Sequence, residues 1–274
     1  MRLSINTHNK LLDLSLPRVM AIVNVSAESF YTTWGWMSED ALLLNIENLL
    51  AQGADLIDLG ACSTRPGSVL ISMEDEWCRL RPALQAIRAH FPNIVISVDT
   101  FRSGIAEKAV LLGADMINDV YGGLADERMW DVVAEKRVPY VLTHGADISA
   151  FVGENDNTMS LVLDFFQSKL DYLRKRGVVD VIIDPGLGFG KTERQNYKLL
   201  QELDLFSTLH APVLVGVSRK SMLYKPLALS SSDVLPATIA ANTIALERGA
   251  SILRVHDVDA AKQAISVYLL THKN

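Results

Sequence analysis

Residues 181–191 read Val-Ile-Ile-Asp-Pro-Gly-Leu-Gly-Phe-Gly-Lys, an apolar and largely β-branched run that ends in an aspartate and a glycine-rich turn. Such an apolar run is typical of a strand that is covered on both faces, as in a parallel sheet. The glycines that follow Asp184 allow the backbone to approach a ligand without interference from a Cβ atom. This stretch is informative about the fold because the same order recurs along the whole chain: an apolar run, then a polar residue, then a polar loop.

The recurring unit predicts strands that alternate with helices. The strands are expected at residues 18–25, 55–60, 94–98, 116–120, 139–142, 181–184, 213–217 and 252–255. Apolar residues at helical spacing, bounded by capping residues or glycines, follow each of them. This alternation indicates an α/β fold, a single (β/α)8 TIM barrel with residues 1–17 as a short hairpin-like cover. An open doubly wound sheet is the alternative, but the first glycine-rich turn lacks the dinucleotide-binding fingerprint.

Length and composition limit the function classes. The chain has 274 residues, 49% of them hydrophobic, and a formal net charge of −6. Since no low-complexity linker interrupts it, we expect one domain over residues 1–274. The acidic balance argues against a nucleic-acid partner, which needs a basic face. Cys62 and Cys78 give no disulfide framework, and no apolar run is long enough to cross a membrane, so we expect a soluble cytoplasmic protein.

Polar residues follow the predicted strands. In a (β/α)8 barrel the carboxyl ends of the strands meet at one face, where active sites lie. We therefore expect the polar residues at these ends to gather in one bowl. They are Asn24, Thr64, Arg65, Asp99, Asn118, His144, Asp184, Lys220, Ser221, Arg254 and His256.

This set combines two kinds of chemistry. Asp99, Asn118 and Asp184 suit a flat heterocycle, because a carboxylate pairs well with adjacent N–H groups on such a ring. The residues that suit an anion, above all a phosphate, are Thr64, Arg65, Arg254 and His256. Asn24 offers one neutral oxygen, which Mg²⁺ accepts when phosphates and waters complete its coordination. The residues thus predict a site for a heterocyclic phosphate ester or pyrophosphate.

From about Pro17 to its C-terminus the chain resembles the dihydropteroate synthases. The blocks that carry the resemblance stand in the order of that family. They are residues 23–25, 53–55 with 57–58, 63–67 (Ser-Thr-Arg-Pro-Gly), 97–100 (Ser-Val-Asp-Thr), 117–119, 184–191, 218–221 (Ser-Arg-Lys-Ser) and 254–257 (Arg-Val-His-Asp). One block alone would be weak evidence, whereas all of them in order are highly specific.

The resemblance implies an activity. Members of this family condense p-aminobenzoate with 6-hydroxymethyl-7,8-dihydropterin pyrophosphate, giving dihydropteroate and pyrophosphate in folate synthesis. It also implies Mg²⁺ as a cofactor, a homodimer, and a target for sulfonamides. The electron-rich dihydropterin supports a cation at its methylene carbon, so the leaving group departs before the arylamine attacks and no protein nucleophile is required. Cationic groups then stabilise the departing anion, and buried carboxylates stabilise the cation.

The resemblance also implies a role for each matching residue. The pterin is held by Asp99, Asn118, Asp184 and Lys220. The pyrophosphate is held by Thr64, Arg254 and His256, and Mg²⁺ contacts Asn24. The p-aminobenzoate pocket is shaped by Phe30, Arg65, Pro66 and Ser221. The catalytic groups are Asp99, Lys220 and, from the first loop, Glu28.

The chain departs from the family's usual pattern in three places. The first loop reads Ser-Ala-Glu-Ser-Phe at residues 26–30, where the family usually has Thr-Pro-Asp-Ser-Phe, so Glu28 would act from a longer arm. The second loop has Ala61-Cys62 in place of Gly-Glu, and residues 143–145 read Thr-His-Gly in place of Met-His-Met. These changes bear on rate and sulfonamide response more than on the class of reaction.

Other functions fit parts of the pattern. A pterin-binding methyltransferase domain would share the barrel and the pterin contacts but needs no residues that bind pyrophosphate. A Schiff-base aldolase would use Lys220 as its nucleophile. A catalytically weak pterin-binding paralogue would keep the pterin site and lose the function of the altered loops.

Overall fold

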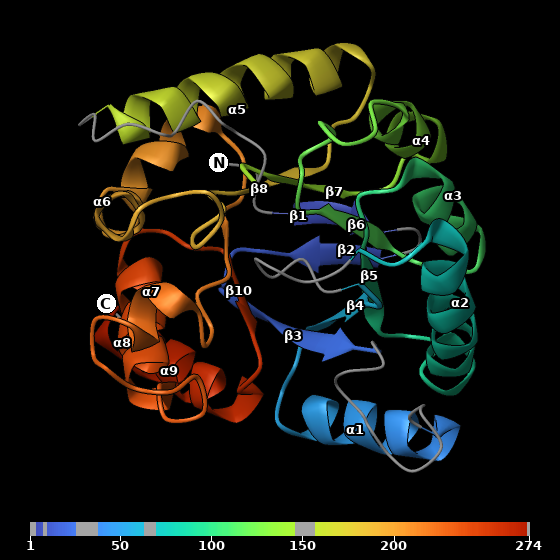
Figure 1. Ribbon diagram of the computed structural model, residues 1–274, viewed down its shortest axis with the longest axis horizontal. Coiled ribbons are helices and arrows are strands. Elements are labelled where there is room, and N and C mark those ends of the chain that lie inside the picture. Colours follow the sequence, from blue (N-terminus) through green and yellow to red (C-terminus); the bar gives the residue numbers. More distant parts are fainter. Residues whose placement is uncertain (1–3, 8–9, 26–37, 63–69, 146–156, 273–274) are drawn as a thin grey trace.

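The computed structural model describes residues 4–7, 10–25, 38–62, 70–145 and 157–272. In this part of the chain, eight parallel strands form a barrel that helices surround (Figure 1). The strands are β3 (Arg18–Asn24), β4 (Leu56–Gly60), β5 (Val95–Asp99), β6 (Met116–Asp119), β7 (Tyr140–Thr143), β8 (Val181–Asp184), β9 (Leu214–Val215) and β10 (Ile252–Val255). The predicted fold class, a (β/α)8 barrel, is confirmed.

The barrel is closed between β8 and the chain just before β9. The strands follow the order β8-β7-β6-β5-β4-β3-β10-β9. Ile183 forms a parallel bridge with Val213, and its backbone N–H donates to the carbonyl of Pro212 at 2.9 Å. Residues 213–217 were expected to form a full strand, whereas only Leu214 and Val215 pair as one.

Helices follow the strands as the apolar spacing predicts. They are α1 (Glu39–Ala51), α2 (Met73–His90), α3 (Ser103–Leu111), α4 (Arg128–Lys136), α5 (Thr158–Lys175), α6 (Glu193–Gln201), α7 (Ser221–Tyr224), α8 (Leu235–Glu247) and α9 (Val258–Thr271). Ser38, Ser72 and Thr192 accept N-cap hydrogen bonds at the starts of α1, α2 and α6. The single-turn α7 and the 3₁₀ segment η2 (Leu203–Leu209) were not predicted. None of the helices in the described ranges combines the length and apolarity that a membrane span requires.

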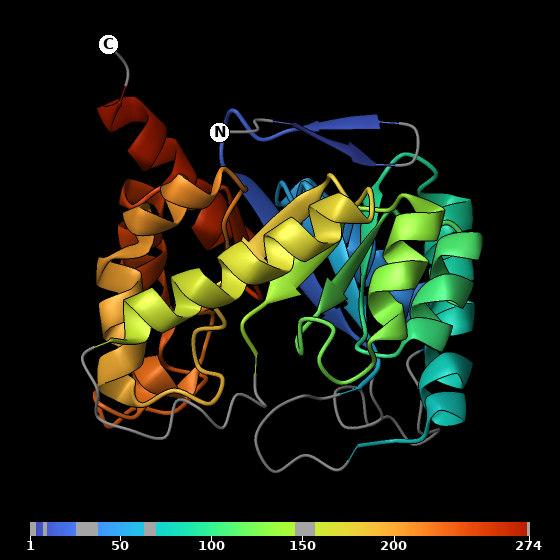
Figure 2. The same cartoon turned by 90° about the horizontal axis from the view of Figure 1, so that it is seen from above.

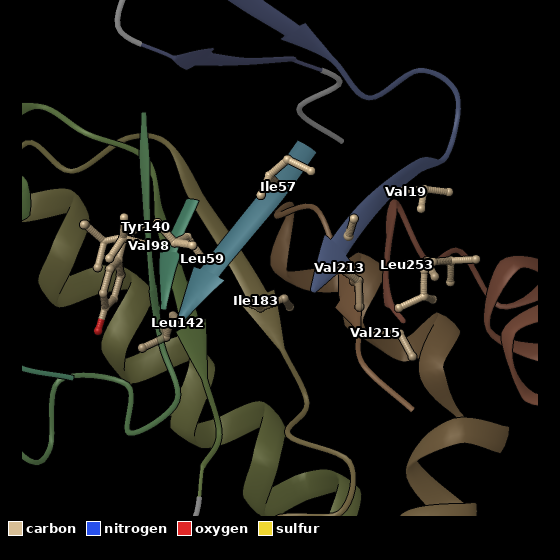
Figure 3. Packing of buried hydrophobic residues seen from close by; sticks show 14 of the residues in the cluster. Val19, Ile57, Leu59, Val98, Tyr140, Leu142, Ile183, Val213, Val215 and Leu253 are labelled. Atoms are coloured by element: carbon tan, nitrogen blue, oxygen red, sulfur yellow. The ribbon is translucent and has the colours of Figure 1, made fainter. Parts of the chain in front are cut away.

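Alternate residues of each strand serve two different layers. On β4, Ile57 and Leu59 belong to the cluster that packs between the strands and the helices, as does Val98 on β5 (Figure 3). Leu56 belongs to a second cluster, to which each strand of the barrel contributes one residue. Because side chains alternate across a strand, the second cluster lies inside the barrel.

The N-terminal hairpin completes this inner cluster. Strands β1 (Ser4–Thr7) and β2 (Lys10–Asp13) pair in antiparallel register, and Figure 2 shows them across one end of the barrel. Ile5, Leu12 and Leu14 pack with the apolar residues near the starts of the barrel strands. The expected cover is therefore present. Its apolar residues and the inner cluster of the strands together form one apolar layer, which we call the floor, at the end of the barrel opposite the carboxyl ends of the strands.

We expect truncation of this floor to destabilise the whole barrel. Ile5 is 1% exposed, and Ile5→Ala should lower the free energy of unfolding by about 2–4 kcal/mol through lost burial and a residual cavity. Leu11 of the same hairpin is 69% exposed, so Leu11→Ala should change it by less than about 0.5 kcal/mol. Urea unfolding measures both values. Equal effects for the two variants would show that the hairpin is not part of the core.

Candidate active site

A polar layer lies directly above the apolar floor. Two positions after each floor residue the strand returns to the same face, and on several strands that residue is polar. Leu56, Met116, Ile182 and Ile252 of the floor are followed in this way by Asp58, Asn118, Asp184 and Arg254. The sheet register agrees, because Asp99 pairs with Asn118 and Thr143 pairs with Asp184. The carboxyl half of the barrel interior is therefore a bowl of charged and amide groups.

Arg254 joins two carboxylates across this bowl. Its Nε donates to Asp58 Oδ2 at 2.6 Å, and its Nη2 donates to Asp99 Oδ2 at 2.7 Å. Asn118 Nδ2 donates to the same Asp58 oxygen at 2.9 Å. Side chains from β10, β4, β5 and β6 thus form one hydrogen-bonded network, which we call the Arg254 clamp.

Burial and charge oppose each other in this network. Burial raises the pKa of Asp99 to about 7, whereas the guanidinium of Arg254 acts to lower it. The carboxylates of Asp58 and Asp99 raise the pKa of Arg254 despite its burial. Arg254 is therefore a permanent cation, and Asp99 is a carboxyl group whose charge state changes near neutral pH.

Asp58 is a site residue that the strand-end reasoning missed. Asp58 does not lie at a strand end but in the middle of β4, between Ile57 and Leu59. Its side chain is fully buried, and it contacts both Arg254 and Asn118. A carboxylate inside an otherwise apolar strand is the sequence signal that could have identified it, since buried charges require partners.

Asp184 and Lys220 form a second part of the bowl. Lys220 Nζ donates to the carbonyl of Leu187 at 2.5 Å and lies 4.2 Å from the ring centre of Phe189. Asp184 Oδ1 accepts from the backbone N–H of Gly186 at 2.8 Å. Burial lowers the pKa of Lys220 to about 8, and Asp184 acts in the opposite direction. Burial also raises the pKa of Asp184, against the attraction of Lys220.

The chain after β9 and β10 supplies further polar groups at the rim. Ser218 Oγ lies 3.0 Å from His256 Nδ1 and also accepts from the backbone N–H of His256 at 3.2 Å. Next to this pair, Arg219 and Asp257 form an ion pair with N–O distances of 2.7 and 2.9 Å. Ser221 is the first residue of α7. Arg219 thus joins the two loops, and His256 is exposed one residue past the end of β10.

His144 was expected in the bowl, and this prediction is wrong. It follows Thr143, whose register partner Asp184 faces inward, so His144 points to the outer side of the barrel. There it packs edge-on against Phe165 of α5, with ring centres 4.9 Å apart. Burial lowers its pKa to about 3, so the imidazole is neutral. His144 is therefore a core residue and not a ligand.

The structure places six of the predicted site residues around the carboxyl ends of the strands: Asp99, Asn118, Asp184, Lys220, Arg254 and His256. Asn24 lies at the end of β3 opposite Gly60, on the face that carries Asp99. Glu28, Phe30, Thr64, Arg65 and Pro66 lie outside the described residues. The chemical roles given to all of these residues stay predictions.

Residues 20–256 match a family model described as pterin binding enzyme. The chain belongs to the pterin-binding enzyme family. Within this family, a dihydropteroate synthase from Clostridium beijerinckii is 35% identical over 243 residues, which cover 88% of each chain. The expected similarity to dihydropteroate synthases is thus confirmed.

Solved structures of dihydropteroate synthases have the same fold as this chain over nearly its full length. A Xanthomonas albilineans dihydropteroate synthase with 4-aminobenzoic acid superimposes with a TM-score of 0.92 at 34% identity, covering 100% of both chains. A structure of that organism's enzyme with 7,8-dihydropteroate gives a TM-score of 0.88 at 32% identity and covers 99% of both chains. These matches include the strands that carry the Arg254 clamp.

The clamp makes a prediction about titration. Because burial raises the pKa of Asp99 to about 7, its side-chain ¹³C signal should titrate near that pH. Asp126 should titrate below its ordinary value of 3.8, because its pKa is lowered by hydrogen bonds from Ser103. Arg254→Met should move the midpoint of Asp99 still higher, since it removes the cation that favours the carboxylate. A wild-type midpoint near 4, or a lower midpoint in the variant, would contradict this assignment.

Proposed function

We propose that this protein is a dihydropteroate synthase, which condenses p-aminobenzoate with 6-hydroxymethyl-7,8-dihydropterin pyrophosphate to give 7,8-dihydropteroate and pyrophosphate. The observation that carries the proposal is the bowl itself. Buried carboxylates and an amide share it with two cations, in a chain that is 34% identical to a dihydropteroate synthase that binds 4-aminobenzoic acid. The enzyme is then a transferase of the pterin methylene group.

The pterin fits the part of the bowl that Asp184, Lys220 and Asn118 line. Asp58 accepts from the amide nitrogen of Asn118, which fixes the amide so that its oxygen remains an acceptor for a ligand. The bond from Gly186 orients the Asp184 carboxylate in the same way. Oriented acceptors of this kind suit a ring that presents several adjacent N–H groups.

The cations of the bowl fit the leaving group. Arg254 keeps its charge at any working pH, and His256 follows two positions later, one residue past the end of β10. Together with Lys220 they stabilise the negative charge that develops as pyrophosphate departs. Asp99 and Asp184 stabilise the positive charge left on the pterin, so the neutral arylamine can attack without a protein nucleophile. In this scheme Asp99 and Lys220 are catalytic, with Glu28 of the first loop.

Mg²⁺ is part of the proposal through Asn24. The described residues contain no group of three or more His, Cys, Asp or Glu side chains arranged to hold a metal ion. Asn24 offers one amide oxygen on the inner face of the barrel, which fits a Mg²⁺ ion whose other ligands are substrate phosphates and waters. When bound, Mg²⁺ would neutralise charge on the pyrophosphate.

We also propose a homodimer and inhibition by sulfonamides. The surface of α8 and α9 supports the dimer, because Ile244, Val267 and Leu270 are exposed on two helices that pack side by side. Sulfonamides resemble p-aminobenzoate and would compete for its pocket. The cytoplasmic location expected from the two cysteines stays a prediction.

Pyrophosphate release tests the proposed function directly. Purified protein with the dihydropterin pyrophosphate should release pyrophosphate only when p-aminobenzoate and Mg²⁺ are both present, and EDTA should abolish release. Asp184→Asn should lower kcat/KM by about 100-fold or more, since it weakens a charged pterin contact. Tight pterin binding without release would instead indicate the catalytically weak paralogue, and methyl transfer would indicate the other family activity.

A further inference from the structure

Lys191 closes the glycine-rich turn that follows β8. Its Nζ donates to three backbone carbonyls, those of His144 at 2.9 Å, Gly186 at 3.0 Å and Phe189 at 3.1 Å. The first of these carbonyls belongs to the chain just after β7, and the other two belong to the turn itself. One ammonium group thus ties the turn to the neighbouring strand end.

The turn is built for this close approach. Gly186 has φ +67°, and a Cβ atom at this position would lie 2.0 Å from the carbonyl oxygen of His144. A side chain there would therefore push the turn away from the end of β7. Gly188, with φ +87°, lies against the other lysine, because its Cβ would be 2.8 Å from Lys220 Cδ. The backbone of the turn is confined from both sides.

The other face of the same turn holds two groups of the bowl. The N–H of Gly186 orients Asp184, and the carbonyl of Leu187 accepts from Lys220. The ring of Phe189 lies beneath the Lys220 ammonium group. The positions of Asp184 and Lys220 therefore depend on a turn that Lys191 holds in place by hydrogen bonds on its other face.

We propose that Lys191 is a positioning residue for pterin binding, which holds the 186–189 turn against β7 and thereby sets the geometry of Asp184 and Lys220. The inference rests on the proposed function for the identity of the ligand. It assigns Lys191 no contact with the substrate. Its effect on catalysis passes through the turn.

The alternative is a lysine that only stabilises the fold, and Lys262 provides the matched control. Lys262 Nζ bonds Asp55 Oδ2 at 2.6 Å, and Asp55 directly precedes β4, at the floor end of the barrel. Lys262→Ala should lower the midpoint of thermal unfolding and leave both KM values within about twofold of the wild type. Lys191→Ala should raise KM for the dihydropterin pyrophosphate about 10- to 100-fold, because the loss of its three hydrogen bonds to backbone carbonyls loosens the turn. KM for p-aminobenzoate should change less than about threefold.

Chemical rescue separates positioning from a general loss of stability. Alanine keeps the Cβ atom, so propylammonium supplies the missing part of the side chain and the three N–H donors. Added propylammonium should restore KM for the pterin substrate in Lys191→Ala to within about threefold of the wild type. Tetramethylammonium, which has no N–H donor, should not change this KM. Neither ion should change the KM of Lys262→Ala for the pterin substrate.

Direct binding keeps this test separate from that of the proposed function. The dissociation constant of a pterin, measured by calorimetry on the full chain, should rise in Lys191→Ala and fall again with propylammonium, whether or not the wild type releases pyrophosphate. If the alanine variant does not fold, Lys191→Met takes its place and should show the same rise in KM and in the dissociation constant. An unchanged pterin KM, an equal rise for both substrates, or no rescue in a folded alanine variant would overturn the proposal.

Discussion

The site depends on a guanidinium group held inside a barrel. Removing the charge of Arg254 from water is costly unless carboxylates replace the lost hydration, and Asp58 and Asp99 do so from two neighbouring strands. Asp58 serves a second purpose because it also accepts from Asn118. The clamp therefore fixes the side chains of four strands at once, before any ligand binds. Such preorganised polar groups are what a site needs to stabilise charge as it develops.

The apolar floor makes the clamp possible. On several strands the inner face is apolar near the start and polar two residues later, so the buried charges lie on a layer that excludes water from below. The hairpin of β1 and β2 seals that layer at the far end. Two buried parts thus cooperate: hydrophobic packing supplies the stability, and the polar layer above it supplies the chemistry. The turn at 186–189 adds the second wall of the bowl, with Lys191 behind it and Lys220 in front.

Much of this arrangement could be predicted from the sequence. Apolar runs that end in Asp99, Asp184 and Arg254 were enough to predict a barrel and the convergence of those ends, because parallel strands of a barrel share one carboxyl face. The role of Asp58 could not be predicted from strand ends, since it depends on partners 60 and 196 residues away in sequence. His144 was misplaced because a shift of one residue reverses the face of a strand. Lys191 donates to backbone carbonyls, and no pattern of side chains in the sequence predicts hydrogen bonds of this kind.

A double-mutant cycle between Asp58 and Arg254 shows whether the clamp is a cooperative unit of the folded barrel. The free energies of unfolding of the wild type, Asp58→Ala, Arg254→Ala and the double variant are measured in urea. A cooperative clamp should give a coupling energy of about 1.5–3 kcal/mol, because each partner compensates the buried charge of the other. The exposed pair of Arg248 and Asp204, treated in the same way, should give no more than about 1 kcal/mol. A coupling energy between Asp58 and Arg254 no larger than that of the surface pair would show that the clamp is not a cooperative unit.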